Sequence, residues 1–232
     1  MLLAALLLGL AAWLTSGRDV QPEKPALELN LPRGALVVDL GAGFGMHAIP
    51  LARGGARVIA IDSSATLLAE LKRLAADVPI SVAHDDLLSF RSHLNEKAAA
   101  ILCMGDTLTH LPEHTNVDFL VQEVADALAP GGQFVLSFRD YSDALLDASR
   151  FIPVRSDERR ILMCFLEYEE DCVVVNDVLH ERSGDAWDTR ISSYRKLRLS
   201  SERVLGSLES FGLDARQQPG LRGMTRIVAR LR

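Results

Sequence analysis

The stretch that decides the fold reads Val37-Val38-Asp39-Leu40-Gly41-Ala42-Gly43-Phe44-Gly45. It lies at the end of an almost continuous apolar run over residues 35–40, which is typical of a buried parallel strand. Glycines at a strand-to-helix turn let the backbone approach a ligand closely, because they accept positive φ angles that other residues resist. In open parallel sheets, ligands bind at the carboxyl ends of the strands. The stretch therefore predicts a ligand site above the first strand of such a sheet.

Strands and helices alternate along the chain after this stretch. Apolar runs predict further strands over residues 57–61, 80–83, 98–104 and 133–138. Helices are predicted over residues 46–53, after a Ser63 or Ser64 cap, and after an Asn116 cap, the last one ending at Pro130-Gly131-Gly132. With a last strand pair over residues 213–217 and 225–231, this alternation predicts an α/β fold. We expect a Rossmann-like, doubly wound, mostly parallel seven-stranded sheet.

The alternation stops after the fifth strand, where three long strands are expected over residues 160–168, 172–181 and 187–199. Short turns separate them, which predicts an antiparallel β insertion. The chain then divides into an N-terminal apolar helix and linker (1–32), a ligand-binding Rossmann-like core (33–149), the antiparallel insertion (150–199), and a C-terminal helix with the final strand pair (200–232). The insertion is expected to form an acceptor lid or a dimer region, and exposed strand edges favour a homodimer.

The first 14 residues form an uncharged run, MLLAALLLGLAAWL. A bilayer span needs roughly 20 apolar residues, so this run is too short. It resembles the core of a signal peptide, but no Lys or Arg precedes it, as such a signal would require. We expect an apolar helix that packs on the domain or caps its site, with a signal peptide as the alternative. A cytoplasmic protein without a membrane partner is therefore predicted.

Composition narrows the classes of function. The 232 residues are 48% hydrophobic and 24% charged, enough to bury one sizeable core. A formal net charge of -6 disfavours a nucleic-acid partner, whose phosphates attract basic surfaces. The three cysteines, Cys103, Cys164 and Cys172, lack the spacing of metal ligands and are too few for a disulfide framework. We therefore expect no metal and a reducing compartment.

Two acidic residues indicate which ligand the glycine stretch binds. Asp62 closes the second expected strand, where a carboxylate can accept hydrogen bonds from both ribose hydroxyls of a nucleoside. A dinucleotide fingerprint has the spacing G-x-G-x-x-G and directs a helix dipole at pyrophosphate. Here the spacing is G-x-G-x-G and Asp39 stands two residues before it, which favours a cationic ligand. A nicotinamide dinucleotide and a turn without a ligand remain the alternatives.

On these residues the chain resembles the class I S-adenosylmethionine-dependent methyltransferases from residue 36 to about residue 141. In that family the segment 39–45 surrounds the methionine moiety, and Asp62 matches the ribose-binding acid. Ala83-His84-Asp85-Asp86 matches the loop whose acid meets the adenine amino group, a role for Asp85 or, alternatively, a helix cap. The segment Ala129-Pro130-Gly131-Gly132 matches the turn before the fifth strand. The resemblance implies a cofactor site made of Asp39, Gly41, Ala42, Gly43, Gly45, Asp62, Ser63, Asp85, Asp86, Met104 and Gly105.

The acceptor side is expected where the fourth strand ends, at Cys103-Met104-Gly105-Asp106-Thr107-Leu108-Thr109-His110-Leu111. It lacks the Asn/Asp-Pro-Pro-Tyr segment of enzymes that methylate nucleobases or glutamine amides. It is similar instead to the Leu-Gly-Asn-Ser-x-x-His-Leu run of glycine and sarcosine N-methyltransferases. Their His-Arg-Asn-Tyr segment resembles Ser137-Phe138-Arg139-Asp140-Tyr141, which implies that Arg139 holds an anionic group of the acceptor with its two-pronged fork.

Asp106 stands where that family has asparagine, so it is expected to attract an amine or to pair with Arg139. His110 is the second candidate proton acceptor, and Tyr194 is expected to line the acceptor pocket. The alternatives are a surface ion pair for Arg139, a helix cap or polar filler for His110, and a half-exposed sheet aromatic for Tyr194. The expected catalytic set is thus Asp106, His110, Arg139 and Tyr194.

The resemblance implies a methyltransferase that uses S-adenosylmethionine and leaves S-adenosylhomocysteine. The expected acceptor is a small polar molecule, an amine or an amino-acid nitrogen. The alternatives are O-methylation of a small metabolite, a cofactor-binding protein without catalysis, and a nicotinamide oxidoreductase.

Overall fold

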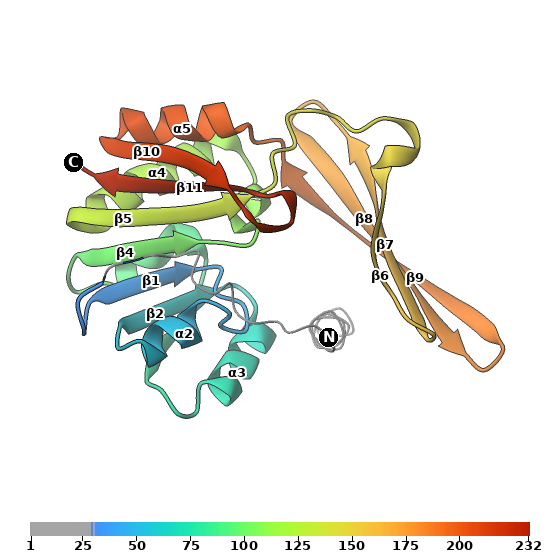
Figure 1. Ribbon diagram of the computed structural model, residues 1–232, viewed down its shortest axis with the longest axis horizontal. Coiled ribbons are helices and arrows are strands. Elements are labelled where there is room, and N and C mark those ends of the chain that lie inside the picture. Colours follow the sequence, from blue (N-terminus) through green and yellow to red (C-terminus); the bar gives the residue numbers. More distant parts are fainter. Residues whose placement is uncertain (1–28, 30) are drawn as a thin grey trace.

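The computed structural model describes residue 29 and residues 31–232. The apolar helix, linker and alternative signal peptide expected over residues 1–32 therefore lie almost wholly outside the described residues. Within the described part, the strands form a seven-stranded sheet and a separate four-stranded sheet, which extends away from the first (Figure 1). No described helix is long and apolar enough to cross a membrane.

The seven-stranded sheet has the order β10-β11-β5-β4-β1-β2-β3. Its strands are β1 Leu36–Leu40, β2 Arg57–Asp62, β3 Ile80–His84, β4 Ala98–Cys103, β5 Leu128–Phe138, β10 Leu213–Pro219 and β11 Thr225–Leu231. The α-helices that connect them are α2 Ala48–Arg53, α3 Ala65–Leu74, α4 His114–Ala127 and α5 Ser201–Ser210. Three 3-10 helices also lie between these strands, η1 Leu87–His93, η2 Thr107–His110 and η4 Leu221–Gly223. Strands β1 to β5 pair in parallel, and β11 is antiparallel to β5 and to β10. The predicted fold class is confirmed.

The sheet has a hydrophobic core on each face. All five residues of β1 are buried, and successive side chains enter opposite cores, Val37 one and Val38 the other. Helices α2 and α3 contribute to the core that contains Val37, and α4 and α5 to the one that contains Val38. Burial on both faces explains why these strands read as continuous apolar runs. It also leaves the strand ends as the place where polar groups can meet.

Two helix starts differ from expectation. Ser64 caps α3 by accepting a hydrogen bond from the Leu67 amide at 3.3 Å, one of the two predicted caps. The predicted cap at Asn116 is wrong, because α4 already begins at His114, after Glu113 in extended conformation. Likewise, α2 begins at Ala48 rather than residue 46, since the glycine turn extends further than its sequence suggested.

The four-stranded sheet, called the second sheet below, has the order β6-β7-β8-β9 and is antiparallel throughout. Its strands are β6 Phe151–Ser156, β7 Arg160–Tyr168, β8 Cys172–Ser183 and β9 Ala186–Leu197, preceded by the 3-10 helix η3 Asp147–Arg150. Three of these strands match the expected insertion. Strand β6 was missed because it is short, contains Pro153, and has a register shift between Pro153 and Arg155.

One face of the second sheet turns toward the seven-stranded core and is called the inner face. There Leu166, Val173 and Val175 pack with Tyr141, which follows β5. The Arg198 guanidinium, directly after β9, donates to the carbonyls of Tyr141 (3.1 Å), Ser142 (2.6 Å), Glu169 (2.9 Å) and Glu170 (3.3 Å). One side chain therefore joins the start, a hairpin turn and the end of the second sheet. The residue boundaries predicted for the four domains stay a prediction.

Candidate active site

The glycine loop lies between β1 and α2. Gly41, Gly43 and Gly45 have φ angles of 70°, 55° and 92°, which favour glycine at each position. A Cβ atom on Gly41 would lie 2.4 Å from Thr107 Cγ2, whereas one on Gly43 would face open space. The loop is therefore packed against the end of β4 at Gly41 and open for close approach at Gly43. Ala42, between them, donates its amide to the Ile61 carbonyl at 3.0 Å.

Asp62 stabilises this loop from the end of β2. Its Oδ2 accepts a hydrogen bond from the Gly43 amide at 2.8 Å, and its Oδ1 accepts one from the Ser64 amide at 2.7 Å. A carboxylate has about four lone-pair positions, so acceptor capacity remains for ligand hydroxyls. The predicted ribose-binding acid thus holds the open part of the glycine loop in place.

Asp39 lies below the loop and is only 1% exposed. Its Oδ2 is buried without a hydrogen-bond partner among the described residues. Burial raises the pKa of Asp39 to about 7, the Ala48 amide opposes this shift, and the negative charge of Asp62 adds to it. A buried, unpaired carboxylate oxygen is costly unless a donor or a cation meets it. The donor set therefore fits a ligand that brings positive charge to this end of the sheet.

The loop after β3 contains two further predicted cofactor residues, Asp85 and Asp86. The Asp85 carboxylate pairs with His93 Nε2 at 2.8 Å and accepts the Asp86 amide at 2.8 Å, so its pKa is lowered, chiefly by His93. Asp86 caps η1 by accepting from the Leu88 amide at 2.8 Å. The Ser63 carbonyl contacts His84 Nε2 at 3.0 Å, which brings the ends of β2 and β3 together. The adenine role of Asp85 stays a prediction.

The segment after β4 is held in a constrained backbone conformation. Gly105 has a φ of 69° with open space in front of its Cα, and its amide donates to Ser137 Oγ at 2.9 Å. Asp106 follows with a φ of 76°, uncommon for a residue with a side chain. Met104, before them, is 4% exposed. Space is therefore open next to Gly105, as it is next to Gly43.

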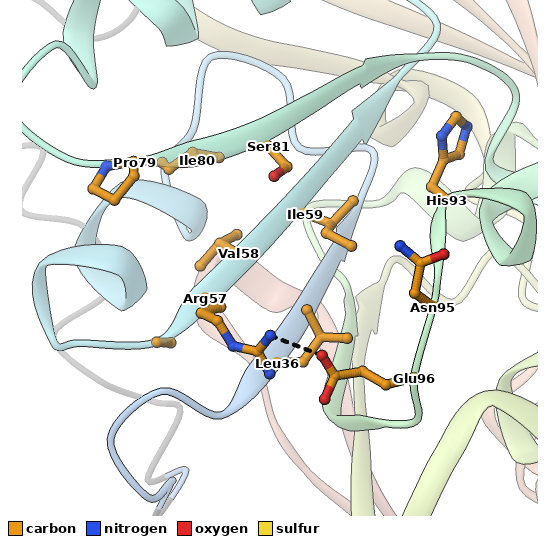
Figure 2. Close-up of a pocket in the computed structure, with 11 residues that line it drawn as sticks. Leu36, Arg57, Val58, Ile59, Pro79, Ile80, Ser81, His93, Asn95 and Glu96 are labelled. Carbon is orange, nitrogen blue, oxygen red and sulfur yellow. Dashed lines mark hydrogen bonds and ion pairs between the residues drawn. The ribbon is translucent and has the colours of Figure 1, made fainter.

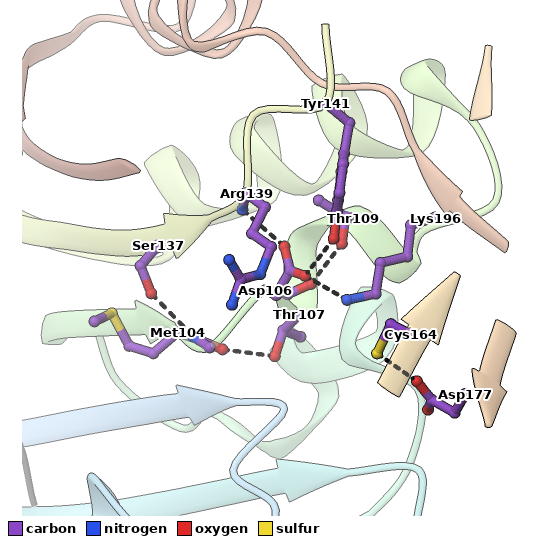
Figure 3. Close-up of polar contacts among 11 residues, drawn as sticks. Met104, Asp106, Thr107, Thr109, Ser137, Arg139, Tyr141, Cys164, Asp177 and Lys196 are labelled. Atoms are coloured by element: carbon purple, nitrogen blue, oxygen red, sulfur yellow. Dashed lines mark hydrogen bonds and ion pairs between the residues drawn. The ribbon is translucent and has the colours of Figure 1, made fainter. Parts of the chain in front are cut away.

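The Asp106 carboxylate is surrounded by donors, as Figure 3 shows. Its Oδ1 accepts the Arg139 amide at 2.8 Å, and its Oδ2 contacts the Tyr141 hydroxyl at 3.4 Å and forms an ion pair with Lys196 Nζ. Asp106 is 5% exposed and Lys196 is 9% exposed. The role of Lys196 could not be predicted from the sequence, where this residue only shares one face of an expected strand with Tyr194.

His110 and Tyr194 complete the acceptor side. Their rings stack with centroids 5.6 Å apart and an interplanar angle of 25°. Burial, and then the positive charge of Lys196, lower the pKa of His110, so the imidazole is neutral in neutral solution. Burial, and then the charge of Asp177, raise the pKa of Tyr194. The structure therefore brings His110 and Tyr194 together, with Asp106 joined to the same face of β9 through Lys196.

A cavity lies at the opposite end of the sheet from the glycine loop (Figure 2). This cavity of about 380 Å³ is lined by residues at the amino ends of β1, β2 and β3, including Leu36, Val58 and Ile80. An ion pair between Arg57 and Glu96 at 2.7 Å lies along it. None of the predicted site residues lines this cavity, and ligands in open parallel sheets bind at the carboxyl ends.

The fold is similar to that of solved S-adenosylmethionine-dependent methyltransferases. The solved structure of SAM-bound CalS10, an amino pentose methyltransferase from Micromonospora echinaspora, matches with a TM-score of 0.73 at 17% identity. The match covers 99% of this chain and 90% of that chain. This likeness shows the fold.

The family model described as a methyltransferase domain matches residues 37–132. The chain is also similar to a glycine/sarcosine N-methyltransferase of Aphanothece halophytica, with 29% identity over 113 residues, 48% of this chain and 42% of the relative. A ubiquinone biosynthesis O-methyltransferase of Xanthomonas axonopodis pv. citri (strain 306) is 31% identical over 129 residues, 50% of this chain and 52% of the relative. The chain spans about half the length of these curated relatives. Residues 37–132 therefore match a methyltransferase domain, and the predicted resemblance is confirmed.

Proposed function

We propose that this chain binds S-adenosylmethionine and moves its methyl group to a small polar acceptor, an amine or an amino-acid nitrogen. The observation that carries the proposal is Asp39, a buried carboxylate oxygen without a partner beneath an open glycine loop. S-adenosylmethionine brings a sulfonium and an α-ammonium, and it has no phosphate to be repelled by Asp39 and Asp62. When bound, this cofactor supplies a methyl group already activated for in-line displacement.

The chain's own residues then bind and align the reactants. Asp39 faces the positive charge, Gly43 and Gly105 leave room for close approach, and Asp62 accepts from the ribose hydroxyls. Alignment of this kind supplies roughly 7–11 kcal/mol in well-oriented reactions. Because the donor is already activated, this placement is the main contribution that the proposal asks of the protein.

On the acceptor side, His110 is the proton acceptor in this proposal, since its lowered pKa keeps the imidazole neutral. Arg139 holds an anionic group of the acceptor, and Tyr194 lines the pocket beside His110. Asp106 contributes by holding the segment after β4, with its proton-accepting role retained as the alternative to His110.

O-methylation is the second candidate function, favoured by the 31% identity to the ubiquinone biosynthesis O-methyltransferase. The proposed cofactor is made inside cells, so we also propose a cytoplasmic location. We further propose a homodimer through the second sheet, and a division of the chain into domains at residues 33, 150 and 200.

The test combines calorimetry with an acceptor screen. Both S-adenosylmethionine and S-adenosylhomocysteine should bind, and amines, amino acids and phenols should be compared for release of S-adenosylhomocysteine. An Asn95→Ala variant is the control, because Asn95 lines the cavity at the opposite end of the sheet. If the Asn95→Ala variant lost the binding heat, the ligand would bind in the cavity at the amino ends of the strands and not at the glycine loop. No heat from either nucleoside on folded wild-type protein would refute the proposed function.

A further inference from the structure

Asp106, expected to attract an amine, is already engaged in the structure. Its two carboxylate oxygens contact the Arg139 amide, the Tyr141 hydroxyl and the Lys196 ammonium, and it is 5% exposed. Pairing with Lys196 neutralises its charge, and burial leaves little room for a second cation. An amine acceptor therefore needs another carboxylate near the end of β4.

Asp177 occupies the matching position on the second sheet. In the antiparallel register, Cys164 is opposite Asp177, Val175 is opposite Tyr194, and Val173 is opposite Lys196. Directly paired residues point to the same side of a sheet, and so do alternate residues along a strand. Asp177, Tyr194 and Lys196 therefore share the inner face. Figure 3 shows Asp177 and Cys164 beside Lys196, on the side of the acceptor residues.

Among the described residues, the hydrogen-bond partner of Asp177 and the phenol beside it are neutral groups. Its Oδ1 accepts from the Cys164 thiol at 2.9 Å, and burial followed by this hydrogen bond raises the pKa of Cys164 to about 12. The Tyr194 hydroxyl lies close enough for the charge of Asp177 to raise its pKa as well. Thiols and phenols are weak partners for a carboxylate compared with a cation. Asp177 is also half-buried, so a charge-assisted hydrogen bond there is strengthened.

Tyr194 stacks on His110, which is the last residue of η2, the 3-10 helix that directly follows Gly105 and Asp106. We propose that Asp177 binds the ammonium group of an amine acceptor and so determines the substrate class of the site. This proposal rests on the proposed methyltransferase function. It assigns recognition of the cationic acceptor to the inner face of the second sheet, and it leaves proton acceptance to His110.

The test is an Asp177→Asn variant assayed with the amine that gives the highest turnover in the acceptor screen. Asparagine keeps an oxygen for the Cys164 thiol and removes the charge, so folding should be retained, as checked by circular dichroism. KM for the amine should rise about tenfold or more, while Kd for S-adenosylmethionine changes less than about twofold. The control is Asp185→Asn, an exposed aspartate at the far turn of the same sheet, which should leave both constants unchanged.

Each outcome bears on one proposal or the other. Partial recovery of KM in Asp177→Glu, which restores the charge, would support the inference. An unchanged KM in Asp177→Asn, or a preferred acceptor that is an uncharged phenol, would overturn it while the methyltransferase function stands. If none of the acceptors in the screen gave turnover, the proposed function and this inference would both be refuted.

Discussion

The glycine end of the parallel sheet and the inner face of the second sheet are built in opposite ways. At the glycine end, the key contacts are made by backbone amides of two neighbouring strand-to-helix turns, Gly43 after β1 and Ser64 after β2, on Asp62. At the inner face, the key contact joins side chains 90 positions apart, Lys196 and Asp106. The first region depends on φ angles that only glycine adopts easily, and the second depends on how a second sheet is packed. The key contacts of the predicted cofactor half therefore span a shorter stretch of sequence than those of the predicted acceptor half.

The largest expected effect concerns the inner face. Lys196→Met leaves the Asp106 carboxylate buried without its cation, and breaking a buried pair in this way costs roughly 3–5 kcal/mol. Urea denaturation should show this drop in the free energy of unfolding. Arg195→Met is the matched control, because its neighbouring ion pair with Glu169 is exposed and is expected to contribute about 1 kcal/mol or less. Equal losses in the two variants would show that the Lys196 pair does not hold the inner face.

The next effect concerns the glycine end. Gly41→Ala forces an alanine into a φ of 70° and places its Cβ 2.4 Å from Thr107 Cγ2. Strain and overpacking together should lower stability by roughly 2–4 kcal/mol and abolish cofactor binding. Gly184→Ala is the control, because Gly184 has a φ of 64° with open space around it, so that only the backbone strain remains. This variant should lower the free energy of unfolding by only about 1–2 kcal/mol. If the two variants unfold alike, the contact with Thr107 has no energetic weight.

A smaller effect is expected when Asp62 is changed to alanine. The variant removes the acceptor for the Gly43 and Ser64 amides and the proposed partner of the ribose. Cofactor Kd, measured by calorimetry, should rise roughly tenfold to a hundredfold. Asp77→Ala serves as the control, since it removes only an exposed pair with Arg53. A cofactor Kd that stays at the wild-type value in Asp62→Ala would exclude the ribose role.

The smallest expected effect is the release of a proton from Asp39 when the cofactor binds. The pKa of Asp39 is raised to about 7, against about 4 in an unfolded chain. This group contributes stability that is full below about pH 4 and is lost as the pH rises through about 7. A cation beside Asp39 favours its ionised form, so cofactor binding at about pH 6 should release close to one proton. Calorimetry in two buffers of different ionisation heat measures this release. Asp39→Asn should abolish it, and identical heats in both buffers for the wild type would contradict the role of Asp39.

The comparison also explains what could be predicted from the sequence. The succession of parallel strands along the chain, the glycine turn and the positions of Asp39 and Asp62 follow from short-range patterns, because period and turn chemistry are encoded within a few residues. The start of α4 could not be predicted, because Asn116 is a good cap but His114 and Thr115 are already helical. The helix begins after Glu113 without a side-chain cap that the sequence could have indicated. The contact of Lys196 and the proposed role of Asp177 could not be predicted either. An exposed and a buried charged residue look the same in the sequence of an isolated strand. The predicted site residues stay predictions until the variants are measured.

Arg198 has a consequence for how this chain can change over generations. Because its guanidinium binds carbonyls at the entrance and at one hairpin of the second sheet, and itself marks the exit, the base of that sheet is secured independently of its far tip. Hairpins beyond this junction can lengthen, shorten or exchange side chains without disturbing the cofactor half. Under the proposed function, acceptor preference can therefore change through substitutions in the second sheet alone, while the proposed cofactor residues stay the same.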